Sequence, residues 1–121
     1  MCIFCKIAAK ELSCFKIYED ENYLGFLDLE PKSNGHSLVI PKKHYENVWD
    51  FKEEGSYLKA IQNVSIILRD KLEIEDLKIV QNNGEYAGQE VLHIHAHLIP
   101  YYQEKETELP LELVYKKFSD D

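Results

Sequence analysis

Apolar and polar positions alternate most clearly over residues 91–100, where a histidine stands at every second position between apolar side chains. These histidines are His93, His95 and His97. Successive side chains of a β-strand point to opposite faces of a sheet, so the pattern predicts a strand with all three rings on one face. Three polar rings on one buried face are costly to desolvate and add little to packing, which favours a chemical role for them.

Weaker patterns elsewhere predict the other elements of the fold. A short helix is predicted over residues 3–10, and strands are predicted over 14–18, 23–29, 36–41 and 77–80. One long helix is predicted over 54–72, because apolar residues recur there at helical spacing: Leu58, Ile61, Val64, Ile67 and Leu68. Turn-forming residues fill 31–35 and 82–84. This order predicts an α+β fold with mostly antiparallel strands and with the helices to one side of the sheet.

The spacing of the three histidines limits what they can do together. Strand residues rise by about 3.3 Å each, so the Cα atoms of His93 and His97 are expected to lie roughly 13 Å apart. One tetrahedral metal ion therefore cannot easily bind all three rings, and at least one ring must have another role. Neutral imidazole can act as a nucleophile or as a general acid or base near neutral pH. The alternative is a structural ladder of histidines without activity.

Composition narrows the class of protein. The chain has 121 residues, 45% of them hydrophobic and 12% aromatic, which is typical of one globular domain rather than of a disordered chain. The formal charge of −8 argues against nucleic acid as the main partner. No apolar run approaches the roughly 20 residues of a membrane helix, and the N-terminus lacks the pattern of a signal peptide. We therefore expect a soluble, cytoplasmic protein without a membrane partner.

The cysteine pattern leaves several readings open. There are three cysteines, Cys2, Cys5 and Cys14, and an odd number without a secretion signal makes a disulfide framework a poor explanation. The Cys2-x-x-Cys5 motif is compatible with redox activity, with metal binding or with chance. A thioredoxin-like motif would follow a strand, and none precedes this one. A zinc site would need two more ligands, and the chain has five histidines to offer.

Several blocks of the sequence together resemble a known family. Residues 93–99, His-Ile-His-Ala-His-Leu-Ile, are similar to the alternating signature of the histidine triad (HIT) superfamily. Similar blocks are found at 26–28 with 35–44, at 82–84 with 88–90, and at 2–7, in the order and spacing of the family. The resemblance covers roughly residues 2–101. It implies a single HIT domain over 1–121, with a core over about 2–101, a C-terminal tail over 102–121, and an antiparallel sheet of about five strands with one long helix and a short N-terminal helix.

The resemblance to the Hint-like, zinc-containing branch also implies a reaction. A member of this branch would cleave nucleoside 5′-phosphoramidates or related adenylates at the α-phosphate. His95 would attack the α-phosphorus and form a nucleotidyl-histidine, from which water would release a nucleoside monophosphate. His97 would hydrogen-bond the phosphate oxygens, and His36 would support the triad or the phosphate.

The same resemblance implies a site for a purine nucleotide such as AMP. Asp28 would accept hydrogen bonds from the ribose hydroxyls, and Asn82 and Gln89 would donate amide hydrogens near the phosphate. Apolar positions would line the base pocket: Ile3, Phe4, Ile7, Phe26, Leu29 and Leu38. Each of these residues also suits an ordinary turn or core position.

Two further implications concern metal and assembly. Cys2, Cys5, His44 and His93 match the pattern of zinc-bearing members, and two thiolates with two imidazoles complete a tetrahedral site. Such a closed site has no position for water, so the zinc would be structural. Small members of the family form two-fold dimers, which implies a homodimer with the long helix near the interface.

Two positions depart from the family pattern and keep other functions open. Glu90 stands where many relatives carry a hydroxyl residue that assists the leaving group, and Tyr101 stands where many carry arginine. These changes leave room for a nucleotide-binding regulatory or scaffold protein with negligible turnover. A dinucleoside polyphosphate hydrolase is a variant of the enzymatic reading, but the acidic chain offers little charge for a long polyphosphate. A redox role for Cys2 and Cys5 would leave the histidines unexplained.

Overall fold

The structure confirms the predicted α+β class with a five-stranded antiparallel sheet. A computed structural model describes residues 2–119; residues 1, 120 and 121 of the predicted domain lie outside this range. The elements follow in the order α1 (Ile3–Ala8), β1 (Lys16–Glu19), β2 (Tyr23–Leu27), β3 (Ser37–Pro41), α2 (Tyr57–Leu72), β4 (Asp76–Val80), a 3₁₀ turn (Glu85–Ala87), β5 (Ala96–Tyr101) and α3 (Leu111–Lys116).

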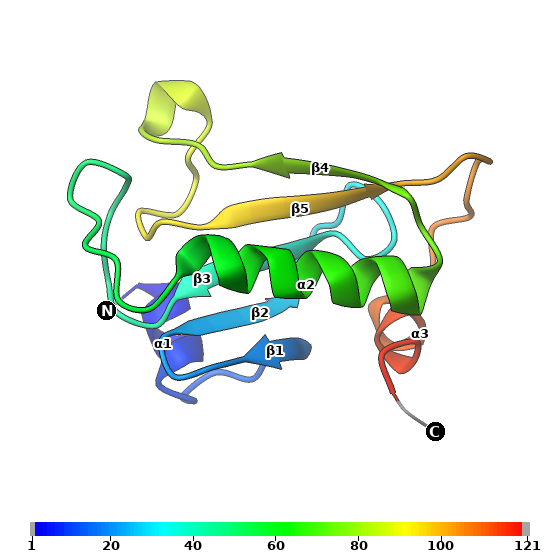
Figure 1. The fold of residues 1–121 in the computed structure, drawn as a ribbon, viewed down its shortest axis with the longest axis horizontal. Coiled ribbons are helices and arrows are strands. Elements are labelled where there is room, and N and C mark those ends of the chain that lie inside the picture. The colour runs from blue at the N-terminus through cyan, green and yellow to red at the C-terminus, as the bar shows by residue number, and fades with distance from the viewer. Residues whose placement is uncertain (1, 120–121) are drawn as a thin grey trace.

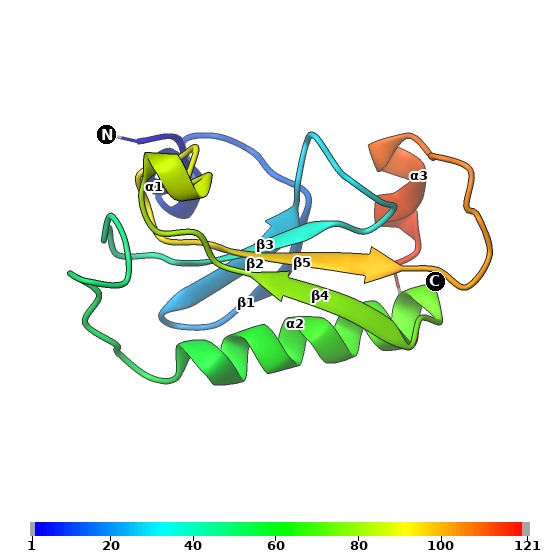
Figure 2. The same ribbon diagram turned by 90° about the horizontal axis from the view of Figure 1, so that it is seen from above.

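The strand that carries His97 is an interior strand of the sheet although it is the last strand in sequence. The strands are arranged in the order β1-β2-β3-β5-β4, so β5 lies between β3 and β4 (Figure 1). The long helix α2 runs along one side of the sheet, whereas α1 and α3 lie on the other (Figure 2). The prediction that the helices lie to one side of the sheet is therefore wrong. The physical reason is that β2 and β3 are buried at every position, so both of their faces need cover.

Two apolar clusters fill these two faces. On the α2 face, Val39 and Leu98 pack against Val64 and Leu68, and all four are fully buried. On the α1 face, Phe4 packs against alternate residues of β2 and β3: Leu24, Phe26, Leu38 and Ile40. The period of two along each strand thus assigns neighbouring residues to different cores.

Helix α2 begins and ends with ordinary capping signals. The Ser56 side chain accepts a hydrogen bond from the amide of Lys59, and Glu73 ends the helix in the left-handed region with φ of 56°. Its buried residues follow helical spacing: Tyr57, Ala60, Ile61, Val64, Leu68 and Leu72. Leu58, which the pattern placed on the apolar face, is 73% exposed. No helix of the described residues is long and apolar enough to span a membrane.

Two parts of the C-terminal half differ from the predicted elements. Strand β5 begins at Ala96, so His93 and His95 precede it; the amide of Ile94 donates to the carbonyl of Tyr45 in a loop instead of to a strand. The alternation of faces nevertheless holds, because Ile94 packs in the α2-face cluster with Ala96. The helix α3 was not predicted; tertiary contacts define it, including the Phe15–Tyr115 ring pair and a hydrogen bond from the Tyr115 hydroxyl to the Lys16 carbonyl.

Candidate functional site

The histidine rings gather on the α1 face of the sheet. His36, His93 and His95 are buried, and His97 is partly exposed. The ring centroids of His95 and His97 are 4.9 Å apart, and those of His36 and His97 are 5.3 Å apart. Phe4 of α1 contacts His93 and His95 edge-on, at centroid distances of 5.8 and 5.1 Å. The N-terminal helix therefore forms one wall around the histidine cluster.

The backbone determines which nitrogen of His95 is free. Its Nδ1 atom lies 2.8 Å from the carbonyl oxygen of His93, which can only accept a hydrogen bond. Nδ1 must therefore carry the proton, and the lone pair of the neutral ring is on Nε2. Burial lowers the pKa of His95, so the ring is neutral at pH 7. Nε2 of His95 is thus available as a nucleophile or base.

A second hydrogen-bond chain orients His97. The amide of Lys32 donates to Nδ1 of His36 over 3.0 Å, so the neutral His36 ring carries its proton on Nε2. That Nε2 atom lies 3.1 Å from Nδ1 of His97, which must accept. His97 then presents an N–H at its own Nε2. Burial, together with the neighbouring rings of His95 and His36, lowers the pKa of His97 to about 4.

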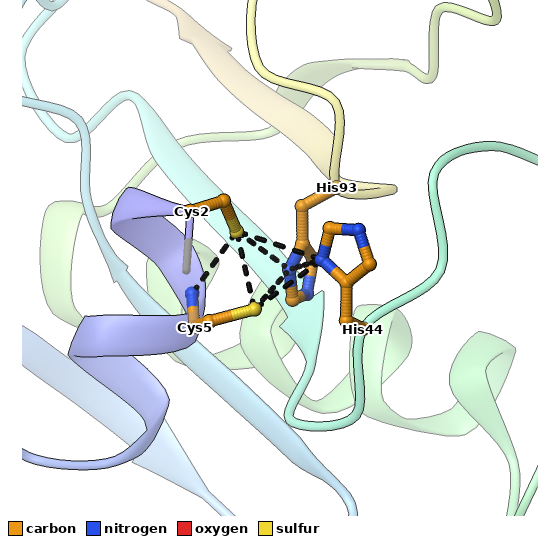
Figure 3. A group of neighbouring side chains, drawn as sticks. All are labelled: Cys2, Cys5, His44 and His93. Atoms are coloured by element: carbon orange, nitrogen blue, oxygen red, sulfur yellow. Dashed lines mark hydrogen bonds between the residues drawn. The ribbon is translucent and has the colours of Figure 1, made fainter.

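His93 also belongs to a group of four side chains whose donor atoms lie within a few ångströms of one another: Cys2, Cys5, His44 and His93 (Figure 3). The sulfurs of Cys2 and Cys5 are 3.2 Å apart, and Nδ1 of His44 is 3.2 Å from Nδ1 of His93. The four sulfur–nitrogen distances lie between 3.3 and 3.6 Å. A tetrahedral zinc site with bonds of about 2.0 Å to nitrogen and 2.3 Å to sulfur has edges of roughly 3.3 to 3.8 Å. The four sulfur–nitrogen distances fall in this range and the nitrogen–nitrogen distance is close to it, whereas the two sulfurs lie closer together than in a zinc site.

The surroundings of the cluster also suit a metal. Nε2 of His93 lies 2.8 Å from the carbonyl of Pro41 and donates to it, which leaves the lone pair of Nδ1 facing the sulfurs. Cys2 is the N-cap of α1, and its sulfur accepts a hydrogen bond from the amide of Cys5. Burial and the neighbouring Cys2 sulfur raise the pKa of Cys5, an effect that a bound cation would oppose. These residues could hold a metal ion.

A second group of possible ligands, Asp28, His36 and His97, is less suited to a metal. Oδ2 of Asp28 lies 3.5 Å from Nε2 of His36 and 4.0 Å from Nδ1 of His97. The amide of Lys32 already occupies the lone pair of Nδ1 on His36, so Nε2 keeps its proton and has no lone pair to give. His36 and His97 are therefore a hydrogen-bonded pair with the Asp28 carboxylate beside them.

Of the residues predicted to bind a nucleotide, Asp28 and Phe4 contact the histidine rings directly. Asp28 contacts His36 and His97, and its Oδ1 accepts from the amide of Glu30. The apolar set divides by burial: Phe4, Phe26 and Leu38 are buried and Ile7 packs beside them, whereas Ile3 is 49% and Leu29 is 66% exposed.

Gln89 and Asn82 differ in what they can offer a ligand. The buried Gln89 amide donates to the carbonyls of Glu46 and Val91 and accepts from the amide of Gly84. Both of its hydrogens are thus used in joining two loops. The Asn82 amide donates only a long hydrogen bond of 3.4 Å, to the Gly88 carbonyl. Asn82 is also less buried than Gln89, so its amide is more accessible to a ligand.

The structure also identifies contributors that the sequence did not. The amide of Lys32 and the carbonyl of Pro41 determine ring tautomers, and a backbone group leaves no signal in the identity of its residue. Glu90 and Tyr101, the two departures from the family pattern, are both exposed. The charge of Glu90 raises the pKa of His95, but burial of the ring has the larger and opposite effect.

Comparison with known proteins gives a consistent result. The family model described as HIT domain matches residues 9–104. Protein hit of Bacillus subtilis is 48% identical over 103 residues, which cover 84% of this chain and 71% of that protein. Adenosine 5′-monophosphoramidase HNT1 of Saccharomyces cerevisiae is 39% identical over 104 residues, which cover 86% of this chain and 65% of that protein. A zinc-bound histidine triad family protein from Mycobacterium smegmatis has a TM-score of 0.82 at 32% identity, with 97% of this chain and 89% of that chain covered.

The low pKa of His97 predicts how stability depends on pH. The ring titrates near 6.5 in an unfolded chain but at about 4 in the folded protein, so the unfolded state binds a proton first as pH falls. This contribution to stability is complete above pH 6.5 and is lost as pH approaches 4. Urea unfolding between pH 7.5 and 4.5 should show a steeper loss for the native protein than for His97→Asn. Protonation of the Cys/His cluster acts on both proteins equally, so identical slopes would contradict the prediction.

Proposed function

The chain belongs to the HIT family, and we propose that it is a nucleotide hydrolase or transferase that cleaves nucleoside 5′-phosphoramidates or related adenylates at the α-phosphate. The observation that carries this proposal is the free Nε2 lone pair of His95, since its Nδ1 proton is held by the carbonyl of His93. A neutral, preoriented imidazole is the group that nucleophilic attack on phosphorus requires. The relative from yeast that is named adenosine 5′-monophosphoramidase supports the choice of substrate class.

The proposed reaction proceeds in two displacements. Nε2 of His95 forms a bond to the α-phosphorus while the bond to the leaving nitrogen breaks, and the amine leaves with the bonding pair and takes a proton from solvent, which the attacking water of the second step returns. Water then attacks the phosphorus, the bond to His95 breaks, and a nucleoside monophosphate is released. The N–H that His97 presents at Nε2 donates to a phosphate oxygen and stabilises the charge that develops there. One water is consumed in the whole cycle.

The surroundings of the rings support a purine nucleotide such as AMP as the ligand. The carboxylate of Asp28 repels a phosphate but accepts hydrogen bonds from ribose hydroxyls, and it lies beside His36 and His97. The apolar side chains of Phe4, Phe26 and Leu38 on the same face suit a flat base.

A regulatory or scaffold role with slow turnover is the second candidate. The exposed carboxylate of Glu90 stands where many relatives have a hydroxyl, and Tyr101 provides no cation at the rim. A dinucleoside polyphosphate hydrolase is less well supported. The charge of Lys32 lowers the pKa values of His36 and His97, but the chain as a whole has a formal charge of −8, so a long polyphosphate would find little compensation.

Hydrolysis of adenosine 5′-phosphoramidate tests the proposal. We expect turnover by the native protein and a loss of roughly a thousandfold or more in His95→Ala, because the covalent route is removed. Lys59→Ala, on the exposed side of α2, serves as the control and should keep its activity. A diadenosine polyphosphate is assayed in parallel. AMP binding without turnover of either substrate would contradict the enzymatic function and favour the regulatory one.

We also propose that Cys2, Cys5, His44 and His93 hold a structural zinc ion. The distances between their donor atoms and the hydrogen bond from His93 to the Pro41 carbonyl support this, and so does the zinc-bound relative. Zinc would join α1 to the segment before β5 and would have no open position for substrate. The carbonyl that orients His95 belongs to His93, so the same residue would bind the ion with its side chain and orient the catalytic ring with its backbone.

Metal analysis of the purified protein tests the zinc proposal. We expect about one zinc per chain in the native protein and none in Cys5→Ser, with a lower melting temperature in the variant because a folding ligand is lost. The matched control is Cys14→Ser, which removes a thiol outside the cluster and should keep the metal. Equal zinc contents in the two variants would refute the assignment.

We further propose a two-fold homodimer formed across β4. The other edge strand, β1, is covered by α3 through the hydrogen bond from Tyr115 to Lys16. The β4 edge has no such cover: Ile79 is 51% exposed, and a groove of about 200 Å³ beside α2 contains the apolar residues Ile66, Ile74 and Leu77. A second copy of the chain would pair with this edge and bury these side chains.

Light scattering after size exclusion tests the dimer. We expect the native protein to have the mass of a dimer and Ile66→Asp to shift toward the monomer, because a buried, unpaired carboxylate disfavours the interface. Leu113→Asp, a comparable exposed apolar residue on α3, should leave the mass unchanged. A native protein that elutes as a monomer would overturn this proposal without affecting the enzymatic one.

A further inference from the structure

A small cleft lies at the end of the sheet where α2 begins, and the proposed reaction does not use it. It has a volume of about 180 Å³ and is formed by the β1–β2 turn, the end of β3 and the loop that leads to α2. Its lining includes Glu21, Lys42, Lys43, Tyr45, Lys52 and Glu54. None of these residues is a histidine of the triad or a side chain of the proposed zinc site.

The charge of the cleft is opposite to that of the chain. Three lysines and two glutamates line it, which gives a formal charge of +1 on a protein of charge −8. Lys42 is paired with Glu19 over 2.7 Å, and Lys43 with Glu54 over 3.3 Å. Within the described residues, Lys52 has no hydrogen bond or ion pair. The cleft therefore has cationic groups to offer an anion, one of them without any internal partner.

A buried hydroxyl in the same cleft lacks an acceptor as well. Tyr45 is only 8% exposed, and its hydroxyl is the one buried side-chain polar atom of residues 2–119 without a hydrogen bond of normal geometry. The Glu54 carboxylate raises the pKa of Lys43, and so does the Tyr45 hydroxyl, in part through a weak hydrogen bond between the two groups. An ammonium group can only donate, so the proton of the hydroxyl still has no acceptor. Buried polar groups are nearly always hydrogen-bonded in folded proteins. An unsatisfied hydroxyl beside lysines indicates that an acceptor from outside the chain belongs there.

We propose that this cleft binds a small phosphate group, as inorganic phosphate or as a compact phosphate monoester. The phosphate oxygens accept from the Tyr45 hydroxyl and from the ammonium groups of Lys43 and Lys52, and the bound anion takes the place of Glu54 beside Lys43. The volume is below the 300 Å³ or more of typical pockets for drug-sized ligands, which excludes a second whole nucleotide. This site is independent of the proposed hydrolase activity.

The site also has a structural connection to the proposed metal cluster. Pro41 lines the cleft, and its carbonyl accepts the hydrogen bond from Nε2 of His93. Lys43 directly precedes His44 in the chain. The cleft and the four-ligand cluster thus share one short segment at the end of β3, although they share no side chain.

Titration with inorganic phosphate tests the proposal by calorimetry and by ¹H–¹⁵N NMR, at constant ionic strength maintained with sodium chloride. We expect saturable binding with NMR shifts in residues 21–54, and competition by sulfate. Tyr45→Phe and Lys52→Gln should each weaken binding by about tenfold, the effect of losing one charge-assisted hydrogen bond. Lys116→Gln makes the same charge change on α3 and should leave the affinity unchanged. A compact phosphate monoester, such as glycerol phosphate, is titrated in parallel to distinguish the two sources of the group.

Two controls keep the result unambiguous. Phosphate can also bind near the triad, so the titration is repeated in His95→Ala; shifts confined to the triad, or affinities unchanged in both cleft variants, would overturn the proposal. Tyr45→Phe should not lower the free energy of unfolding, since it removes a hydroxyl without an acceptor. A clear destabilisation by this variant would show that the hydroxyl is satisfied inside the protein and would also count against the site.

Discussion

The candidate site depends on the hydrogen bonds of one histidine, His93, made by its ring and by its main-chain carbonyl. The ring of His93 donates to the carbonyl of Pro41, so that Nδ1 faces Cys2, Cys5 and His44. The main-chain carbonyl of the same residue accepts the Nδ1 proton of His95. One residue therefore orients the cluster of possible metal ligands with its side chain and the candidate nucleophile with its backbone, and a displacement of His93 would disturb both.

The sheet is covered on both faces, and this separates the polar histidine rings from the apolar cluster beneath α2. Residues between the histidines pack against α2, while the rings lie on the opposite face beneath Phe4. Burial on that face lowers the pKa values of His36, His93, His95 and His97. It outweighs the nearby carboxylate of Asp28, which raises the pKa values of His36, His95 and His97, so the rings are neutral. The helix α1 is consequently part of the site and also part of the core.

The sequence predicted the fold class better than the strand pairing and the tertiary contacts within it. Period two around His95 and helical spacing around Val64 report burial directly, so the α+β class followed from them, as did the side of most of these residues, with Leu58 as an exception. The start of β5 at Ala96 was missed because strand pairing, which the pattern does not contain, ends where Ile94 bonds to Tyr45. The helix α3 depends on contacts with Phe15 and Lys16, about a hundred residues away. Which of the residues predicted to be catalytic or to bind nucleotide do so stays a prediction.

The tautomers of the rings have a consequence for how this family can vary. His36, His93 and His95 are each oriented by a main-chain amide or carbonyl, and these groups are the same for every amino acid except the amide that proline lacks. Lys32 can therefore be replaced by any residue except proline, and Pro41 by any residue, without changing which ring nitrogen carries the hydrogen. A one-residue insertion or deletion between Asp28 and His36 would move the amide out of reach, so natural variation in this loop should occur in residue type and not in length.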